Sequence, residues 1–175
     1  MLLGEVDGKV FAVESKEDAD FLKSLNANVV SNLVLYIDEK VDPSWLEGVE
    51  NMYVYRLLAL KVKDLDKLKE IARKGDSTVR TNIAIREDIE LDEELLDMLL
   101  NDPDPNVVAT TIHKHMTIPY LKLKKMLEEG GVKAKIVLHL GKLEASDYEE
   151  WMQKGEQYAK LIAANKFTPQ HLLYR

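Results

Sequence analysis

An apolar segment recurs along the chain at intervals of 25 residues, with a single interval of 28 residues. The first position of successive copies holds Val29, Val54, Val79, Val107, Val132 and Gln157, and the position four residues later holds Leu33, Leu58, Ile83, Thr111, Ile136 and Leu161. A unit this short cannot bury its apolar face alone and must stack against its neighbours. The spacing therefore predicts a solenoid over residues 27–175, with about six units.

The first part of each unit fits either a helix or a short buried strand. Leu33–Ile37 and Ile136–Leu140 are apolar runs that do not distinguish between the two, because a short apolar run carries little period information. Val79, Ile83 and Arg86 follow helical spacing better than strand alternation. We therefore expect helices here and an all-α fold, with a β/α solenoid as the alternative.

The second part of each unit begins at a helix-start signal and continues with apolar residues at helical spacing. The signals are Asp42-Pro43, Asp64, Asp92, Ile118-Pro119, Ser146-Asp147 and Thr168-Pro169. The side chains expected to face the core are Trp45, Leu46, Val49, Leu65, Leu68, Ile71, Ala72, Leu91, Leu95, Leu96, Leu99, Leu121, Leu123, Met126, Leu127, Tyr148, Trp151 and Met152. Each unit is thus expected to contain two packed helices.

Residues 1–26 are expected to form a cap on the first unit. Asp7-Gly8 lies between two apolar runs and predicts a β-hairpin, since both central residues of such a turn need a positive φ. Ser15 then opens a helix as its N-cap. A cap covers the otherwise exposed end of an array, and cap and array together count as one domain. Alternatively, the cap is a degenerate extra repeat, because Phe11-Ala12-Val13 resembles Ile83-Ala84-Ile85.

Composition excludes several classes of function. The chain has no cysteine, which rules out disulfides, thiolate metal sites and cysteine nucleophiles. It shows neither a secretory signal nor an apolar run long enough to cross a membrane, so we expect a soluble, cytoplasmic protein. The net charge is −7. Residues 1–50 carry 11 acidic and 4 basic side chains, whereas residues 132–175 carry 5 acidic and 7 basic ones. The acidity of the N-terminal part disfavours nucleic acid and anionic membranes there.

Two stretches identify a family resemblance. One runs from Tyr158 to Leu173 and contains Asn165 and Thr168-Pro169, and the other runs from Val79 to Asp104. Both are similar to units of the leucine-rich repeat variant family, whose members are helical arrays akin to HEAT repeats. In that family an α-helix is paired with a shorter, often 3₁₀, helix, and the units stack into a right-handed superhelix. The resemblance covers roughly residues 28–175 and implies a right-handed helical-repeat solenoid.

The resemblance implies a binding scaffold rather than an enzyme. Some members of the wider family carry an iron–sulfur cluster domain, which the absence of cysteine excludes here. We therefore expect a non-catalytic protein–protein interaction module that binds a partner, possibly an acidic one, along the repeat surface. The alternative is a nucleic-acid-binding or DNA-repair protein of HEAT-like type, which the net charge of −7 disfavours.

One aligned position collects basic side chains. It reads Tyr36, Lys61, Arg86, Lys114, His139 and Ala164 through the six copies. Stacking would place four of these residues (Lys61, Arg86, Lys114 and His139, here called the cationic ladder) about 10 Å apart, which is the distance between packed helices. Such a row is suited to gripping an acidic peptide or a phosphate backbone. The competing interpretation is that this is simply the first exposed position after the core segment.

The remaining polar groups suggest no cofactor, metal or catalytic centre. His113 and His115 are two residues apart, so their rings point to different faces of a helix and suit a shared metal poorly. A contact of His115 with His139 in the next unit is conceivable. The acidic stretch 87–94 lies at a helix start, where carboxylates interact favourably with exposed amide groups, and is expected to be a solvated helix face.

Overall fold

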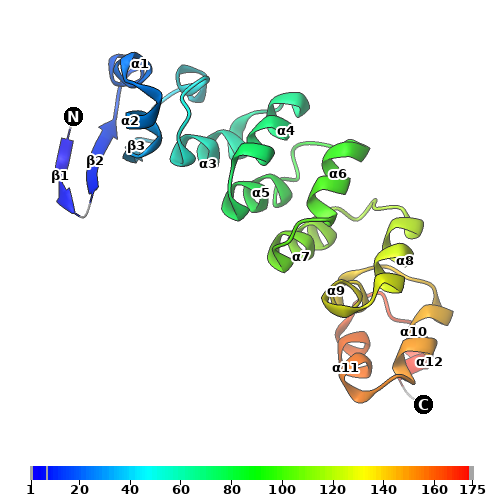
Figure 1. The fold of residues 1–175 in the computed structure, drawn as a ribbon. Helices are drawn as coiled ribbons and strands as arrows, with labels where there is room; N and C mark the ends of the chain where they lie inside the picture. Colours follow the sequence, from blue (N-terminus) through cyan, green and yellow to red (C-terminus); the bar gives the residue numbers. More distant parts are fainter. Residues whose placement is uncertain (1, 7, 174–175) are drawn as a thin grey trace. The chain divides into compact units, whose positions relative to one another are not determined.

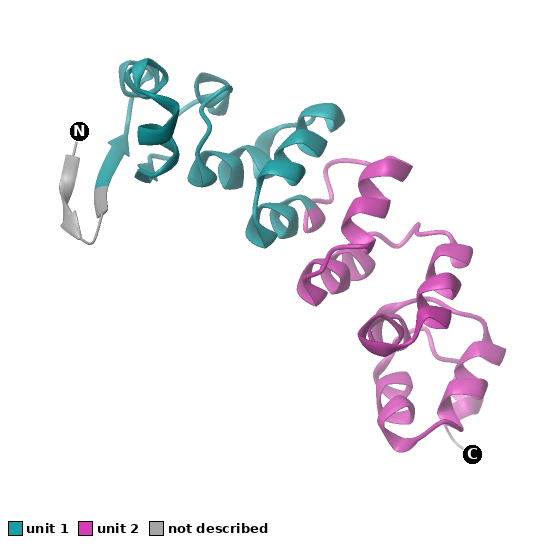
Figure 2. Cartoon of the chain, viewed as in Figure 1, with its two compact units in different colours: residues 1–83 teal, residues 84–175 magenta. Residues whose placement is uncertain are grey.

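The computed structural model describes residues 2–6 and 8–173, with side chains from residue 10 onward. The described chain is largely helical, and its helices contact their neighbours in sequence (Figure 1). It divides into two compact units, residues 1–83 and residues 84–175 (Figure 2). The predicted helical character is therefore confirmed.

The first unit begins with a small sheet. Strand β1 (Leu2–Val6) pairs antiparallel with β2 (Gly8–Val13), as the hairpin prediction required, although Asp7 of the predicted turn lies outside the described residues. Strand β3 (Val34–Ile37) then pairs with β2 in parallel, so that Phe11 lies opposite Leu35. Helices α1 (Lys16–Ser24) and α2 (Ala27–Ser31) connect the two parallel strands. Ser15 caps α1 as predicted, because its side chain accepts a hydrogen bond from the Asp18 N–H.

The expectation of a helix over residues 33–37 is wrong for the first copy. Val34 and Ile37 are β-branched and Tyr36 is aromatic, which favours a strand, and the edge of β2 supplies hydrogen-bond partners for the backbone of this segment. Local propensity and an available edge together favour the strand here. No strand is present in residues 84–173 as the structure describes them, and Ile136–Leu140 of the fifth copy lies within helix α9 (Gly131–Leu140), as expected.

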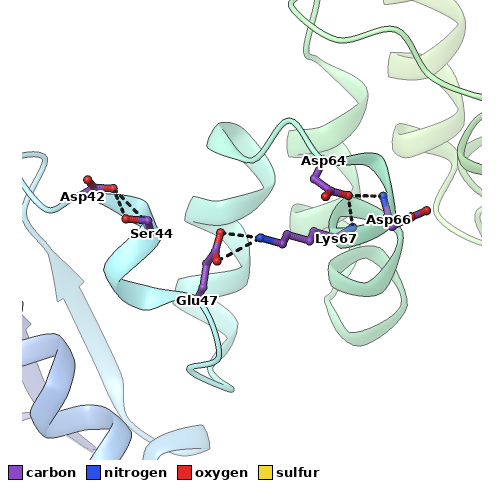
Figure 3. Close-up of polar contacts among 6 residues, drawn as sticks. All are labelled: Asp42, Ser44, Glu47, Asp64, Asp66 and Lys67. Carbon is purple, nitrogen blue, oxygen red and sulfur yellow. Dashed lines mark hydrogen bonds and ion pairs between the residues drawn. The ribbon is translucent and has the colours of Figure 1, made fainter.

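Further elements follow β3 in the first unit. They are η1 (Pro43–Leu46), α3 (Met52–Lys61), α4 (Leu65–Lys74) and α5 (Ser77–Ala84), the last of which ends on the first residue of the second unit. Of these, η1 and α4 begin at predicted caps. Asp42 caps η1 by accepting from the Ser44 N–H, and Asp64 caps α4 by accepting from the N–H groups of Asp66 and Lys67 (Figure 3). Lys67 also reaches Glu47 at 3.2 Å, which links α4 to the end of η1.

The second unit contains helices from four successive copies. They are α6 (Glu93–Leu100), α7 (Pro105–Lys114), α8 (Tyr120–Glu129), α9, α10 (Ala145–Met152), α11 (Glu156–Ala164) and α12 (Gln170–Leu173). Helix α9 packs against both α7 and α11, and also against α8. The first helices of three consecutive copies thus lie against one another in this unit, with one continuous core beneath them.

Most of the predicted core side chains are buried or half-buried, and Tyr148, Leu68, Leu95 and Leu127 are fully enclosed. Leu121 is the exception. It is 77% exposed, because Leu123, Met126 and Leu127 already fill the buried face of α8. One predicted start is also shifted: α10 begins before Ser146, at Ala145, and the Asp147 side chain accepts from the Glu144 N–H.

Candidate binding cavity of the second unit

A cavity of about 490 Å³ lies within the second unit. Three helix ends and the loops that follow them form its walls. Its apolar lining consists of Ile112, Met116, Ile118, Leu123, Leu140, Leu143, Ala164 and Phe167, and its polar lining includes His113, His115, Tyr120, His139, Lys142, Glu144 and Lys166. Ligand sites in proteins are typically concave, largely apolar hollows of this size with a few polar groups.

The cavity lies at the C-terminal ends of α7, α9 and α11, where each first helix turns toward the second helix of its unit. Gly141 ends α9 in a confined position. A Cβ atom there would lie 2.9 Å from the Val137 carbonyl oxygen and 3.2 Å from Val137 Cγ1. A side chain at residue 141 would therefore force α9 and its loop apart, so the glycine permits the close approach that shapes this wall.

The carbonyl groups at the end of α9 are satisfied from within the fold. Asn165 Nδ2 donates to the carbonyl oxygens of Leu138 and Gly141, each at 2.8 Å. The Tyr148 hydroxyl donates to the same Gly141 oxygen and accepts from the Leu143 N–H. Unpaired carbonyls at a helix C-terminus carry partial negative charge. Their pairing here removes a source of repulsion for an anion at the cavity wall.

Tyr120 takes part in a buried polar cluster behind the cavity. Its hydroxyl donates to Asp147 at 2.5 Å, and Lys124 donates to the other carboxylate oxygen. Burial favours the neutral form of Asp147, but the hydrogen bonds from Lys124 and Tyr120 outweigh burial and hold the pKa of this carboxyl below its ordinary value. The bond to Asp147 raises the pKa of Tyr120 well above its ordinary value. At neutral pH the Tyr120 hydroxyl is therefore protonated, and its proton is held in the hydrogen bond to Asp147.

The two histidines that the sequence suggested might meet both line this cavity. His115 Nε2 lies 2.9 Å from the Ala84 carbonyl oxygen, and since a carbonyl only accepts, this nitrogen carries the proton. His139 Nδ1 is buried and has no hydrogen-bond partner among the described residues. The ring itself is half-buried, which leaves its opposite edge, with Nε2, as the part that can face the cavity.

Two lysines at the cavity have no carboxylate partner among the described residues. Lys142 is exposed and follows Gly141 directly. Lys166 lies against the apolar lining, with its Nζ 5.0 Å from the centre of the Phe167 ring and 3.7 Å from Met116 Sδ. Glu144 is the single carboxylate of the lining. The cavity is therefore apolar inside and, with neutral histidines, carries a net charge of +1.

The members of the cationic ladder differ in their surroundings. Lys61 is exposed at the last residue of α3. Arg86 is buried, contrary to the expectation of an exposed edge, because its guanidinium forms a two-pronged hydrogen bond with Asp88 at 2.8 and 2.9 Å. Lys114 is exposed and lies 3.5 Å from Glu87. His139 belongs to the cavity. A binding role for these residues stays a prediction.

The acidic stretch 87–94 borders a second, wider hollow that shares His115, Met116 and Ile118 with the cavity. Asp92 caps α6 through the Leu95 N–H, as the helix-start interpretation predicted. Lys122 crosses to Glu93, and Lys114 to Glu87. Among the described residues no group of three or more histidine or carboxylate side chains is arranged to hold a metal ion.

Sequence reasoning missed Lys142, Lys166 and the role of Asn165. The two lysines occupy loops after successive first helices and share no aligned position, so the comparison of equivalent positions could not join them. In the sequence, Asn165 stands out only as a polar residue that follows an apolar run. The signal that could have found it is that asparagine at a helix end tends to bond neighbouring backbone.

Comparison of the chain with protein-family models, with characterised protein sequences and with solved structures gives no match. None of the helices in the described residues combines the length and apolarity needed to span a bilayer. The cavity, with its apolar lining and two lysines that lack a described carboxylate partner, is therefore the feature on which a function is proposed.

Proposed function

We propose that the chain is a right-handed helical-repeat solenoid that acts as a non-catalytic protein-interaction module, and that it holds a segment of its partner in the cavity of the second unit. The packing of α9 between α7 and α11 supports the solenoid, since stacked first helices are what such an array requires. The parallel pairing of Phe11–Val13 with Leu35–Ile37 fits the alternative that the cap is a modified repeat.

The cavity is the observation that carries the binding role. Its volume of about 490 Å³ suits a few side chains of a bound segment. Eight of its lining side chains are apolar, and Met116 is 61% exposed, so apolar surface at this site remains in contact with water. Covering that surface with a partner's apolar side chain is favourable by about 25 cal/mol per Å².

Two polar groups of the lining support a binding role, because their hydrogen bonds are already made within the fold. Tyr120 and His115 are already hydrogen-bonded to Asp147 and to the Ala84 carbonyl, and a general acid or base must be free to exchange its proton with a substrate. These groups stiffen the walls instead. A rigid, preformed hollow lowers the entropic cost of holding a segment of another protein.

The test is selection of a phage-displayed library of random twelve-residue peptides against the full chain. Enriched clones are then measured on the wild type and on Ala164→Trp. Ala164 is exposed at the last residue of α11 and lines the cavity, so an indole at this position fills the hollow without entering the core. We expect clones that bind the wild type and lose at least tenfold in affinity on Ala164→Trp. Clones that bind both proteins equally, or no enrichment at all, would contradict the proposal.

A control keeps this test interpretable. The melting temperature of Ala164→Trp should stay within a few degrees of the wild type, because substitutions at exposed positions change the free energy of unfolding by only about 0.5 kcal/mol. A second variant, Ala163→Trp, places the same side chain at the neighbouring exposed position of α11 that does not line the cavity. Binding to Ala163→Trp should match the wild type.

A further inference from the structure

We infer that the segment bound in this cavity is acidic, with an apolar anchor side chain next to one or more carboxylates. The inference rests on the proposed function and adds the chemistry of the partner. Its basis is the pair of lysines, Lys142 and Lys166, which border an apolar hollow and have no carboxylate partner among the described residues.

These two lysines differ from the two lysines of the wider hollow next to the cavity. There, Lys122 is paired with Asp97 at 2.8 Å and Lys114 with Glu87 at 3.5 Å. Two lysines left unpaired at one cavity therefore mark a place where an incoming carboxylate finds charge that the fold has not neutralised.

The position of Lys166 makes its charge effective. Its ammonium lies over the Phe167 ring and near Met116, both of which line the cavity. An anchor side chain that enters the cavity would remove water from this ammonium, and an ion pair gains strength as the local dielectric constant falls. An apolar anchor and an adjacent carboxylate therefore reinforce each other at this site.

The surroundings also direct where a carboxylate can bind. The wider hollow next to the cavity is bordered by four carboxylates (Glu87, Asp88, Glu90 and Glu93) and two lysines (Lys114 and Lys122). With a neutral His115 its lining carries a net charge of −2, which disfavours an anion. Residues 132–175, which supply Lys142 and Lys166, carry a net charge of +2. An acidic segment is thus disfavoured over the wider hollow and favoured at the end of the cavity that α9 and α11 form.

His139 adds a second polar contact. Its buried Nδ1 has no partner among the described residues, and an unpartnered nitrogen in an apolar setting is most cheaply kept without a proton. The proton then lies on Nε2, at the edge of the ring that can face the cavity. This N–H is available to a carboxylate or carbonyl oxygen of the bound segment.

The experiment uses the clones selected on the full chain and measures each on two charge-reversal variants. Lys142→Glu/Lys166→Glu reverses the two cavity lysines. Lys125→Glu/Lys135→Glu makes the same change of net charge at exposed lysines of α8 and α9 that do not line the cavity. We expect the cavity-dependent clones to contain at least two aspartates or glutamates beside an apolar residue. Their affinity should fall at least tenfold on the first variant and less than twofold on the second.

The outcomes separate the inference from the proposed function. A clone that loses affinity on Ala164→Trp binds in the cavity. If such clones are neutral or basic and bind Lys142→Glu/Lys166→Glu as well as the wild type, that result would overturn the inference of an acidic partner and would leave the proposed interaction module intact. Equal losses on both charge-reversal variants also overturn it, because the effect is then one of net charge alone. Clones that ignore Ala164→Trp overturn both.

Discussion

Asn165 Nδ2 lies 2.8 Å from the carbonyl oxygen of Gly141, which belongs to the preceding repeat. The same amide group also donates to Leu138 O, and its oxygen accepts from the Phe167 N–H. Asn51 makes the equivalent set of bonds, to the carbonyl oxygens of Val30 and Leu33 and from the Tyr53 N–H. In both cases a buried asparagine bonds two carbonyl groups, three residues apart, near the C-terminal end of an earlier helix: α9 for Asn165 and α2 for Asn51.

Replacement of Asn165 should therefore weaken the contact between the last two repeats and lower the stability of the chain. Asn165→Ala removes the side-chain donor of the buried Leu138 carbonyl and the acceptor of the Phe167 N–H, and leaves the Gly141 carbonyl with the Tyr148 hydroxyl. We expect a loss of about 3 kcal/mol in the free energy of unfolding. Urea unfolding monitored by circular dichroism measures it. The control is Asn101→Ala, which removes an exposed amide from the C-cap of α6 and should cost about 0.5 kcal/mol. Equal losses for the two variants would show that burial of Asn165 is not what matters.

The periodic apolar pattern predicted the helices well, because burial and helical spacing leave a direct mark on sequence. Asp42, Asp64 and Asp92 also mark their helix starts correctly, since an N-cap is a local interaction. The strand at Val34–Ile37 was not predictable from this pattern. It exists because β2, distant in sequence, offers an open edge, and pairing of this kind is invisible in a short apolar run.

The candidate site was less accessible to sequence reasoning than the fold. Alignment of repeats found His139 but grouped it with Arg86, which is buried against Asp88. Lys142 and Lys166 come together only because the loops after α9 and α11 lie at one cavity. Loop positions have no period, so nothing in the spacing of the repeats could bring these two residues into one hypothesis.

Helix α8 offers a direct comparison of a predicted and an actual core position. Leu123 is buried beside Met126, whereas Leu121 is exposed. We expect Leu123→Ala to lower the free energy of unfolding by about 3 kcal/mol, since it leaves a cavity in the core. Leu121→Ala removes the same atoms from an exposed side chain and should change it by less than about 0.5 kcal/mol. The two losses would be similar if Leu121 faced the core as the sequence predicted.

Arg86 and Lys114 occupy the same position in the repeat alignment, but their surroundings predict very different losses of stability on charge reversal. Arg86→Glu should lower the melting temperature markedly, because it places a carboxylate against Asp88 in a buried position. Lys114→Glu breaks only an exposed ion pair with Glu87 and should cost no more than about 1 kcal/mol. Differential scanning fluorimetry compares the two. An unchanged melting temperature for Arg86→Glu would show that the side chain of residue 86 does not need to be buried against Asp88.

The cluster behind the cavity predicts a pH dependence with a defined sign. The pKa of Asp147 is lower in the folded chain than its ordinary value, so its contribution to stability is fully present above the unfolded pKa and is lost as pH falls through the folded one. Urea unfolding at a series of pH values from 7 down to 2 should show stability falling below about pH 4. In Asp147→Asn this part of the fall should be absent.

Removal of the cation tests the cause of that shift. Lys124→Met leaves Asp147 buried with only the Tyr120 hydroxyl and the Glu144 N–H as donors. We expect the free energy of unfolding at pH 7 to drop by about 2 kcal/mol. The fall of stability below about pH 4 should be smaller than in the wild type, because the folded pKa of Asp147 then lies closer to its unfolded value. An unchanged pH profile in Lys124→Met would mean that the lysine does not set the charge state of Asp147.

Hydrogen–deuterium exchange of the full chain, with and without the tightest selected peptide, tests the central claim most directly. A segment seated in the cavity should slow exchange of amides in residues 112–118, 139–144 and 164–167, and should leave residues 10–83 unchanged. Protection that falls in residues 10–83, or no protection of the cavity segments at saturating peptide, would contradict the assignment of the cavity as the binding site.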